Sequence, residues 1–106
     1  MSATSTERTS TETAAAIAGV SVRLIDLAAR RRHLRPDGNL AGIGCPRHWP
    51  DSEIAIARRC AQVAAAIPGA EFLAVVAAFH EQLRTGHDVV LDGPWGELVI
   101  VGIEHA

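Results

Sequence analysis

The sequence predicts a mainly α-helical fold with a small β component, built from four helices, a central hairpin and a C-terminal hairpin. Two long stretches carry apolar residues at the three- and four-residue spacing of a helix that is buried on one side. The last segment changes to short β-branched runs around a Gly/Pro turn, which is typical of a hairpin. The chain has 106 residues, a length that suits a single domain.

The N-terminal region is predicted to contain a polar tail and one short helix. Residues 1–9 are rich in Ser and Thr and nearly free of apolar side chains, so we expect a disordered tail. Ser10 or Thr11 offers an N-cap for a helix that continues to about Ala18. Gly19 can end this helix because glycine adopts the left-handed backbone conformation without strain.

A second helix is predicted directly after this glycine. Ser21 is a good N-cap for a helix over about 22–33, and Pro36 prevents that helix from continuing. Two short helices separated by Gly-Val-Ser are typical of a helix-turn-helix. The helical period divides the second helix into a polar face and a packing face. The polar face holds Arg23, Asp26, Leu27 and Arg30, and the packing face holds Ile25, Ala28 and Ala29.

Residues 34–49 contain too many Gly and Pro residues for a regular helix. We expect a loose β-hairpin there, with its tip near 37–44 and its return strand ending at Trp49. Pro50 suits the first position of a third helix.

The third and fourth helices are predicted from their apolar stripes. Asp51 and Glu53 lie in the first turn of the third helix, where the helix dipole favours carboxylates. Pro68 and Gly69 end this helix, and a fourth helix follows over about 70–84. The two stripes are Ile56, Cys60, Val63 and Ile67, then Phe72, Val76, Phe79 and Leu83.

The C-terminal hairpin is expected to pair residues 89–91 with 98–101 around a turn at 92–96. Trp95 in this turn is expected to close the hairpin onto its own core. An exposed anchor for a partner protein is the alternative for this tryptophan.

Charge is distributed unevenly along the chain. All ten basic residues are arginine, and the total formal charge is −2. Residues 23–59 hold eight arginines against four acidic residues, a net charge of +4. Residues 60–106 hold one arginine against six acidic residues, a net charge of −5, and residues 1–22 contribute −1. This asymmetry favours a face that binds nucleic acid, opposite an acidic face. The alternative is that the arginines only keep the helix surfaces solvated.

Composition narrows the class of protein. Two cysteines are too few for a disulfide scaffold, and no apolar run is long enough for a membrane span or a signal peptide. We therefore expect a cytoplasmic protein without a membrane partner. Nineteen alanines and the absence of lysine suggest a GC-rich coding bias, as in actinobacteria and their phages.

The predicted elements follow the order helix, turn, helix, hairpin, helix, and three short motifs lie among them. They are Ala-Gly-Val-Ser at 18–21, Leu-Arg-Pro at 34–36 and Gly-Cys-Pro-Arg-His-Trp-Pro at 44–50. On these residues the stretch from Ser10 to about Ile67 resembles the DNA-binding domain of MerR-family transcriptional regulators, including the short actinobacterial and phage versions. The resemblance implies one winged helix-turn-helix domain over 10–106, with 10–67 as the matching part and 68–106 as an addition.

The resemblance also implies roles for individual residues. The helix that begins at Ser21 would enter the major groove, with Arg23 and its neighbours on bases or phosphates. Arg47 on the wing would contact the DNA backbone, and Trp49 would anchor the wing on the core. The full set of expected DNA-contacting residues is Ser10, Ser21, Arg23, Asp26, Leu27, Arg30, Arg31, Arg35, Arg47 and His48.

This chain departs from the family pattern in two places. Residues 26–28 read Asp-Leu-Ala where the family has Arg-Tyr-aromatic, and Asp26 would repel phosphate unless Arg23 or Arg30 pairs with it. The three arginines at 30–32 would then supply affinity for the DNA backbone. The helix at 70–84 would be about 22 Å long, too short for the family's dimerising coiled coil. We therefore predict no small-molecule effector, and expect the C-terminal segments to complete the core or to form a small self-association surface.

Metal binding and catalysis are not predicted. Cys45 and His48 have the spacing of half a zinc site, and Cys60 could approach them, but a wing turn and a buried core cysteine explain the three residues better. The acid–base grouping of His80, Glu81, His87 and Asp88 lacks a nucleophile and a phosphate-binding loop. We expect neither an enzyme nor a cofactor.

The leading function is a sequence-directed DNA-binding regulator of the MerR type, a repressor or a regulator of a phage or mobile element. Its partner would be double-stranded DNA, bound as a homodimer or in a side-by-side assembly. Two alternatives stay open. One is an excisionase-like factor that bends DNA for recombination, and the other is a protein-interaction module that has lost DNA binding, which Asp26 favours.

Overall fold

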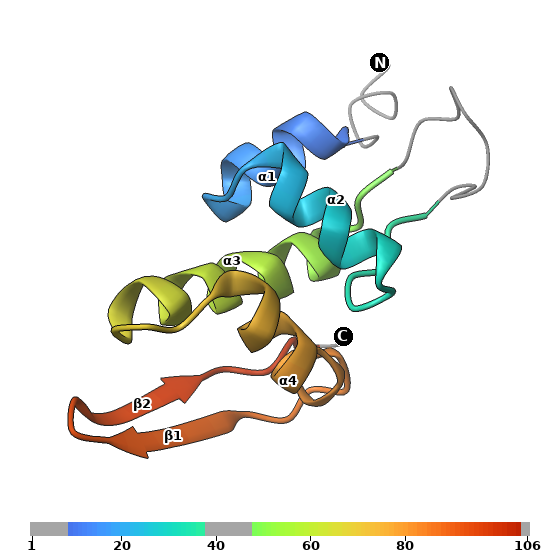
Figure 1. The fold of residues 1–106 in the computed structure, drawn as a ribbon. Coiled ribbons are helices and arrows are strands. Elements are labelled where there is room, and N and C mark those ends of the chain that lie inside the picture. Colours follow the sequence, from blue (N-terminus) through green and yellow to red (C-terminus); the bar gives the residue numbers. More distant parts are fainter. Residues whose placement is uncertain (1–8, 38–47, 105–106) are drawn as a thin grey trace.

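The computed structural model describes residues 9–37 and 48–104. It contains four helices and one two-stranded antiparallel sheet, so the prediction of a mainly α fold with a small β component is confirmed. Figure 1 shows α1 and α2 on one side of α3, with α4 and the hairpin on the other side. The elements are α1 (Thr11–Ala18), α2 (Val22–Arg30), α3 (Asp51–Ala66), α4 (Phe72–Arg84), β1 (Val89–Gly93) and β2 (Gly96–Ile100).

The turn between α1 and α2 is formed by the predicted capping residues. The hydroxyl oxygen of Ser10 accepts from the amide of Thr13 at 3.1 Å, and that of Ser21 accepts from the amide of Leu24 at 3.2 Å. Gly19 ends α1 with φ +81°, a left-handed conformation that costs a side-chain-bearing residue about 1 kcal/mol. The two helices are therefore joined by a short turn whose geometry glycine favours.

Helix α2 ends at Arg30, three residues before the predicted end at 33. Arg32 has φ +65°, and the amides of His33 and Leu34 both donate to the carbonyl oxygen of Ala28, at 3.0 and 3.2 Å. This left-handed residue turns the chain back under the helix, which buries Leu34 completely. The helix was predicted too long because burial of Leu34 outweighs one more helical turn.

Helices α3 and α4 supply nine of the twenty buried apolar residues in the described part of the chain. Ile56, Cys60 and Val63 are buried as the stripe predicted, whereas Ile67 at the end of α3 is only half-buried. In α4 the start lies at Phe72, two residues later than predicted. Its buried residues include Phe72, Val76 and Leu83, with Phe79 partly exposed beside them.

The C-terminal hairpin forms in the predicted place, with Val89 opposite Ile100 and Gly93 opposite Gly96. Trp95 does not close the hairpin onto the core, so this prediction was wrong. Its side chain is 44% exposed, and its ring lies against Gly93, where there is no room for a Cβ atom. A ring at the tip of a two-stranded hairpin packs on its own turn because the tip extends beyond the helices (Figure 1).

The central hairpin is represented by its base. Asp37 and His48 form an antiparallel bridge, with N–H to carbonyl distances of 2.7 and 2.8 Å in the two directions. Asp37 therefore lies at the base of this segment and not in its tip, because its backbone is already paired. The predicted tip and return strand fall on residues 38–47, outside the described residues.

The folded domain also includes the last residue of the predicted tail. The carbonyl oxygen of Thr9 accepts from the amide of Trp49 at 3.0 Å. The other tail residues, 1–8, lie outside the described ranges. None of the helices in the described ranges is long and apolar enough to cross a membrane.

Candidate nucleic-acid interface

The outer face of α2 carries the residues predicted to contact DNA. Ile25, Ala28 and Ala29 are completely buried against the core. Arg23 and Arg30 are exposed, and the packing of the opposite face therefore fixes their direction toward solvent. Asp26 and Leu27 lie between these arginines and are partly exposed.

Asp26 is paired within its own helix. Its Oδ2 atom accepts from Nε of Arg30 at 2.7 Å, across one helical turn. This pair is solvent-exposed, so its contribution to stability is small. Its consequence is electrostatic, because the arginine opposes the carboxylate charge that would otherwise repel phosphate. Arg30 was one of the two partners that the sequence offered for this role.

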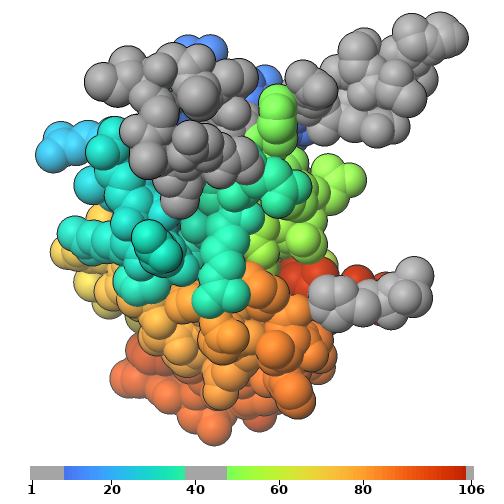
Figure 2. Space-filling view, turned by 90° about the vertical axis from the view of Figure 1, so that its right-hand side faces the viewer, coloured from blue at the N-terminus to red at the C-terminus, as the bar shows by residue number. Residues whose placement is uncertain are grey.

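Arg31 and Arg32, which directly follow α2, are exposed like Arg23. None of them forms an ion pair with any residue of 9–37 or 48–104. Figure 2 shows this region of the surface, with α2 and the following turn in teal above the orange residues of α4. These side chains are available to a negatively charged partner.

Arg35, another of the predicted DNA-contacting residues, forms contacts with α3 and α4. Its Nη2 atom donates to Oε1 of Glu81 on α4 at 3.1 Å. Its backbone amide donates to Oε1 of Glu53 at 2.8 Å. The Arg35 side chain is half exposed, so phosphate would compete with Glu81 for the guanidinium group.

A buried ion pair holds the turn after α2 in place, and the sequence analysis missed it. Glu53 is 5% exposed, and its two carboxylate oxygens accept from Nε and Nη2 of Arg84 at 2.9 and 2.8 Å. Nη2 of Arg84 also donates to the carbonyl oxygen of His33 at 2.9 Å. The hydrogen bond and the charge of Glu53 raise the pKa of Arg84, although burial opposes this. The one available signal was that Arg84 is the only basic residue after position 60.

Two histidines lie beside this ion pair. The rings of His33 and His80 are 5.1 Å apart between centroids, and Nη1 of Arg84 lies 2.8 Å from Nδ1 of His80. Because arginine only donates, Nδ1 of His80 must accept, and the neutral ring carries its proton on Nε2. Burial lowers the pKa of His80, and the positive charge of Arg84 adds to this effect. Nδ1 of His33 is buried and has no hydrogen-bond partner in the described part of the chain.

The predicted wing anchor is Trp49, which is 1% exposed. Its indole Nε1 donates to Oγ1 of Thr11 at 3.0 Å, and its backbone amide binds Thr9. These bonds attach the base of the central hairpin to the start of α1. His48 is half-buried beside this anchor, and Arg47 lies outside the described residues.

The hydroxyl oxygens of Ser10 and Ser21, two of the predicted DNA-contacting residues, accept the helix-cap hydrogen bonds. Ser10 also donates from its hydroxyl to Oγ1 of Thr13 at 3.0 Å. Trp49 thus joins the start of α1 to the base of the central hairpin.

The described residues include no group of three or more potential metal ligands. Cys45 lies outside them. Cys60 is buried in the core as predicted, and burial raises its pKa to about 12, which keeps it a thiol.

The C-terminal acid–base grouping is dispersed among structural contacts. Nδ1 of His87 lies 2.9 Å from the hydroxyl oxygen of Thr85, and Asp88 accepts from the amide of Gly102 at 2.8 Å.

Comparison with known proteins identifies no relative of this chain. The chain matches no protein-family model, no curated protein and no solved structure.

Proposed function

We propose that this protein is a double-stranded DNA-binding regulator of the MerR-like winged helix-turn-helix type, with α2 as the recognition helix. The observation that carries the proposal is the outer face of α2, where exposed arginines stand opposite a completely buried packing face. We propose that it acts as a repressor or as a regulator of a phage or mobile element.

The dimensions and chemistry of α2 suit the major groove. Nine residues give a helix of roughly 13 Å, comparable with a major groove about 12 Å wide. Arg23 lies in the first turn and Arg30 in the last, so the two guanidinium groups span the groove. The partly exposed Leu27 between them offers an apolar contact for a thymine methyl group.

Phosphate contacts would come from the ends of the helices and from the turn after α2. Backbone amides at the starts of α1 and α2 favour anions. Arg31 and Arg32 add two exposed cations at the other end of α2. The proposed wing residue, Arg47, would extend the contact to the neighbouring backbone.

The ion pair of Asp26 with Arg30 weakens the main argument for a protein-interaction module that has lost DNA binding. An excisionase-like role uses the same surface and differs in its effect on DNA. Cooperative binding with bending of a long site would identify that role.

The proposal is tested by selecting bound sequences from random duplex DNA and measuring affinity for the best site at several salt concentrations. We expect Arg23→Ala to weaken binding about tenfold or more, because an arginine lost from a base or phosphate is not replaced. Arg58→Ala is the matched control, since Arg58 is also exposed but lies on α3. Equal affinities for the wild type and both variants, or affinity independent of salt, would refute DNA binding by α2.

A further inference from the structure

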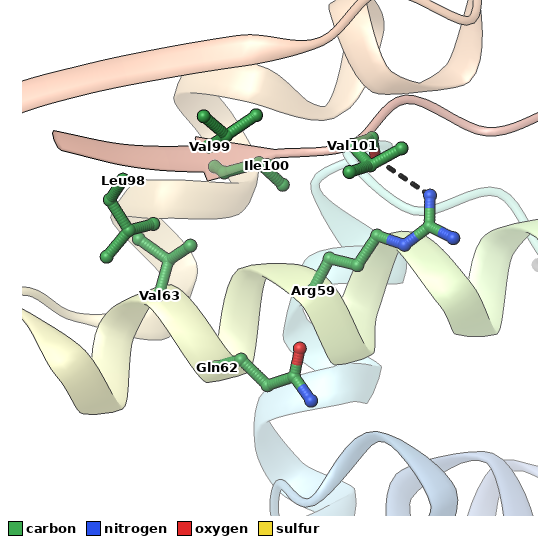
Figure 3. A pocket seen from close by; sticks show the side chains of 7 residues that line it. All are labelled: Arg59, Gln62, Val63, Leu98, Val99, Ile100 and Val101. Atoms are coloured by element: carbon green, nitrogen blue, oxygen red, sulfur yellow. Dashed lines mark hydrogen bonds between the residues drawn. The ribbon is translucent and has the colours of Figure 1, made fainter.

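A groove runs between the free edge of β2 and the side of α3. Its volume is about 460 Å³. Figure 3 shows the residues that line it: Arg59, Gln62 and Val63 from α3, residues 98–100 from β2, and Val101 directly after β2. The groove lies on the opposite side of α3 from α1 and α2 (Figure 1). It is therefore separate from the face proposed to bind DNA.

One wall of this groove is an unpaired strand edge. The sheet has two strands, so β2 pairs with β1 on one side, and no other strand of the described residues pairs with its second side. Such an edge presents backbone N–H and carbonyl groups that can hydrogen-bond to another extended chain. Val99 on this strand and Val101 directly after it are about half exposed, which leaves the approach to the edge open.

The groove is apolar at the end farther from Arg59. Val63 on α3 and Leu98 on β2 point toward one another in Figure 3. Val63 is already buried, whereas Leu98 is half-buried, so a ligand that covers Leu98 removes further apolar surface from water. This site suits one aliphatic side chain of an extended peptide.

One end of the groove is positively charged. Nη1 of Arg59 donates to the carbonyl oxygens of Val101 and Gly102, at 2.7 and 3.0 Å. These bonds fix the guanidinium group at the end of β2. Its Nε and Nη2 atoms have no hydrogen-bond partner among residues 9–37 and 48–104, and no carboxylate there pairs with it. A fixed arginine with unused donors is suited to a carboxylate.

We propose that this groove binds an extended, acidic segment of a partner protein as a third strand on β2. The segment would place an aliphatic side chain against Val63 and Leu98, and a carboxylate on Arg59. This inference does not depend on DNA binding. If the chain also binds DNA through α2, it would connect that DNA to the partner protein held in this groove.

The test uses the full chain and a fluorescein-labelled peptide, Ser-Thr-Val-Thr-Val-Thr-Asp-Asp, titrated by fluorescence anisotropy. One matched peptide carries lysines in place of the aspartates, and another carries proline in place of the first valine. We expect the lysine peptide to bind about tenfold more weakly, because like charges then meet at Arg59. The proline peptide should also bind more weakly, because it lacks a backbone donor. Amide chemical shifts should change at residues 98–101.

Protein variants separate the groove from the rest of the surface. Gln62→Glu adds a negative charge at the groove and should weaken the acidic peptide about tenfold while favouring the lysine peptide. Gln82→Glu is the matched control on the exposed surface of α4 and should change neither affinity.

Equal binding of the acidic and lysine peptides, or absence of binding, would overturn the proposal. Shift changes confined to other residues would overturn it as well. Concentration-dependent self-association that blocks the groove would also overturn it, because the occupant would then be a second copy of this chain.

Discussion

The buried ion pair of Glu53 and Arg84 joins α3 and α4 to the turn that follows α2. Arg84→Ala removes both hydrogen bonds to Glu53 and the bond to the His33 carbonyl oxygen. It leaves a carboxylate that is 5% exposed with the amide of Arg35 as its hydrogen-bond partner in the described chain. The variant therefore tests whether this pair holds the proposed recognition helix on the core.

The magnitude follows from the burial of the two groups. Removing one partner of a buried ion pair costs about 3–5 kcal/mol, because the other charge is left uncompensated. The side chain of Arg84 is 16% exposed, so water can replace it in part, and we expect about 3 kcal/mol. For a domain of this size the corresponding fall in Tm is roughly 12–24 °C.

The assay is urea unfolding followed by circular dichroism, with the wild type, Arg84→Ala and Glu53→Met/Arg84→Met compared at one pH. The double variant should be more stable than Arg84→Ala, because it leaves no unpaired buried charge. Arg58→Ala, an exposed arginine on α3, is the control and should change the free energy of unfolding by less than about 0.5 kcal/mol. If Arg84→Ala were no more destabilising than Arg58→Ala, the reasoning would be refuted.

Two further predictions concern the same part of the fold. The pKa of His80 is lowered below its ordinary value of 6.5, mainly by burial, so the unfolded state takes up a proton more readily. The part of the free energy of unfolding that depends on the neutral His80 ring is fully present above pH 6.5, and it is lost as the pH falls through the folded pKa. The free energy of unfolding should therefore decrease less between about pH 7.5 and 5.5 in His80→Gln than in the wild type. An unchanged slope would contradict the assignment. Gly19→Ala should lower stability by about 1 kcal/mol in thermal unfolding, because φ is +81° there. Gly19→Asn should cost less, and equal losses would argue against backbone strain.

Local sequence signals were sufficient for the helix caps and the turn between α1 and α2. Ser10, Gly19 and Ser21 mark helix ends through bonds to residues at most four positions away, and such bonds can be read from spacing. The buried face of α2 follows from the helical period in the same way. The pairing of Asp26 with Arg30 was foreseen as one of two alternatives because both lie on one helix face.

Contacts between distant segments could not be read in this way. The end of α2 is set by the burial of Leu34, and the tip of the C-terminal hairpin extends too far for Trp95 to reach the core. Helix propensity and turn chemistry carry no information about how far such segments lie from the core. Both predictions failed for that reason.

The sequence by itself determined four helices, one C-terminal hairpin, the buried face of α2, most of the buried stripes of α3 and α4, and the separation of a basic middle from an acidic end. These features depend on periodicity and on short-range capping, which act within a few residues. Only the tertiary structure decided that Glu53 meets Arg84 across 31 positions, that Trp49 binds the start of α1, and that β2 leaves a groove beside Arg59. Partners so far apart in sequence meet only because the helices pack around one core, and no local pattern encodes that meeting.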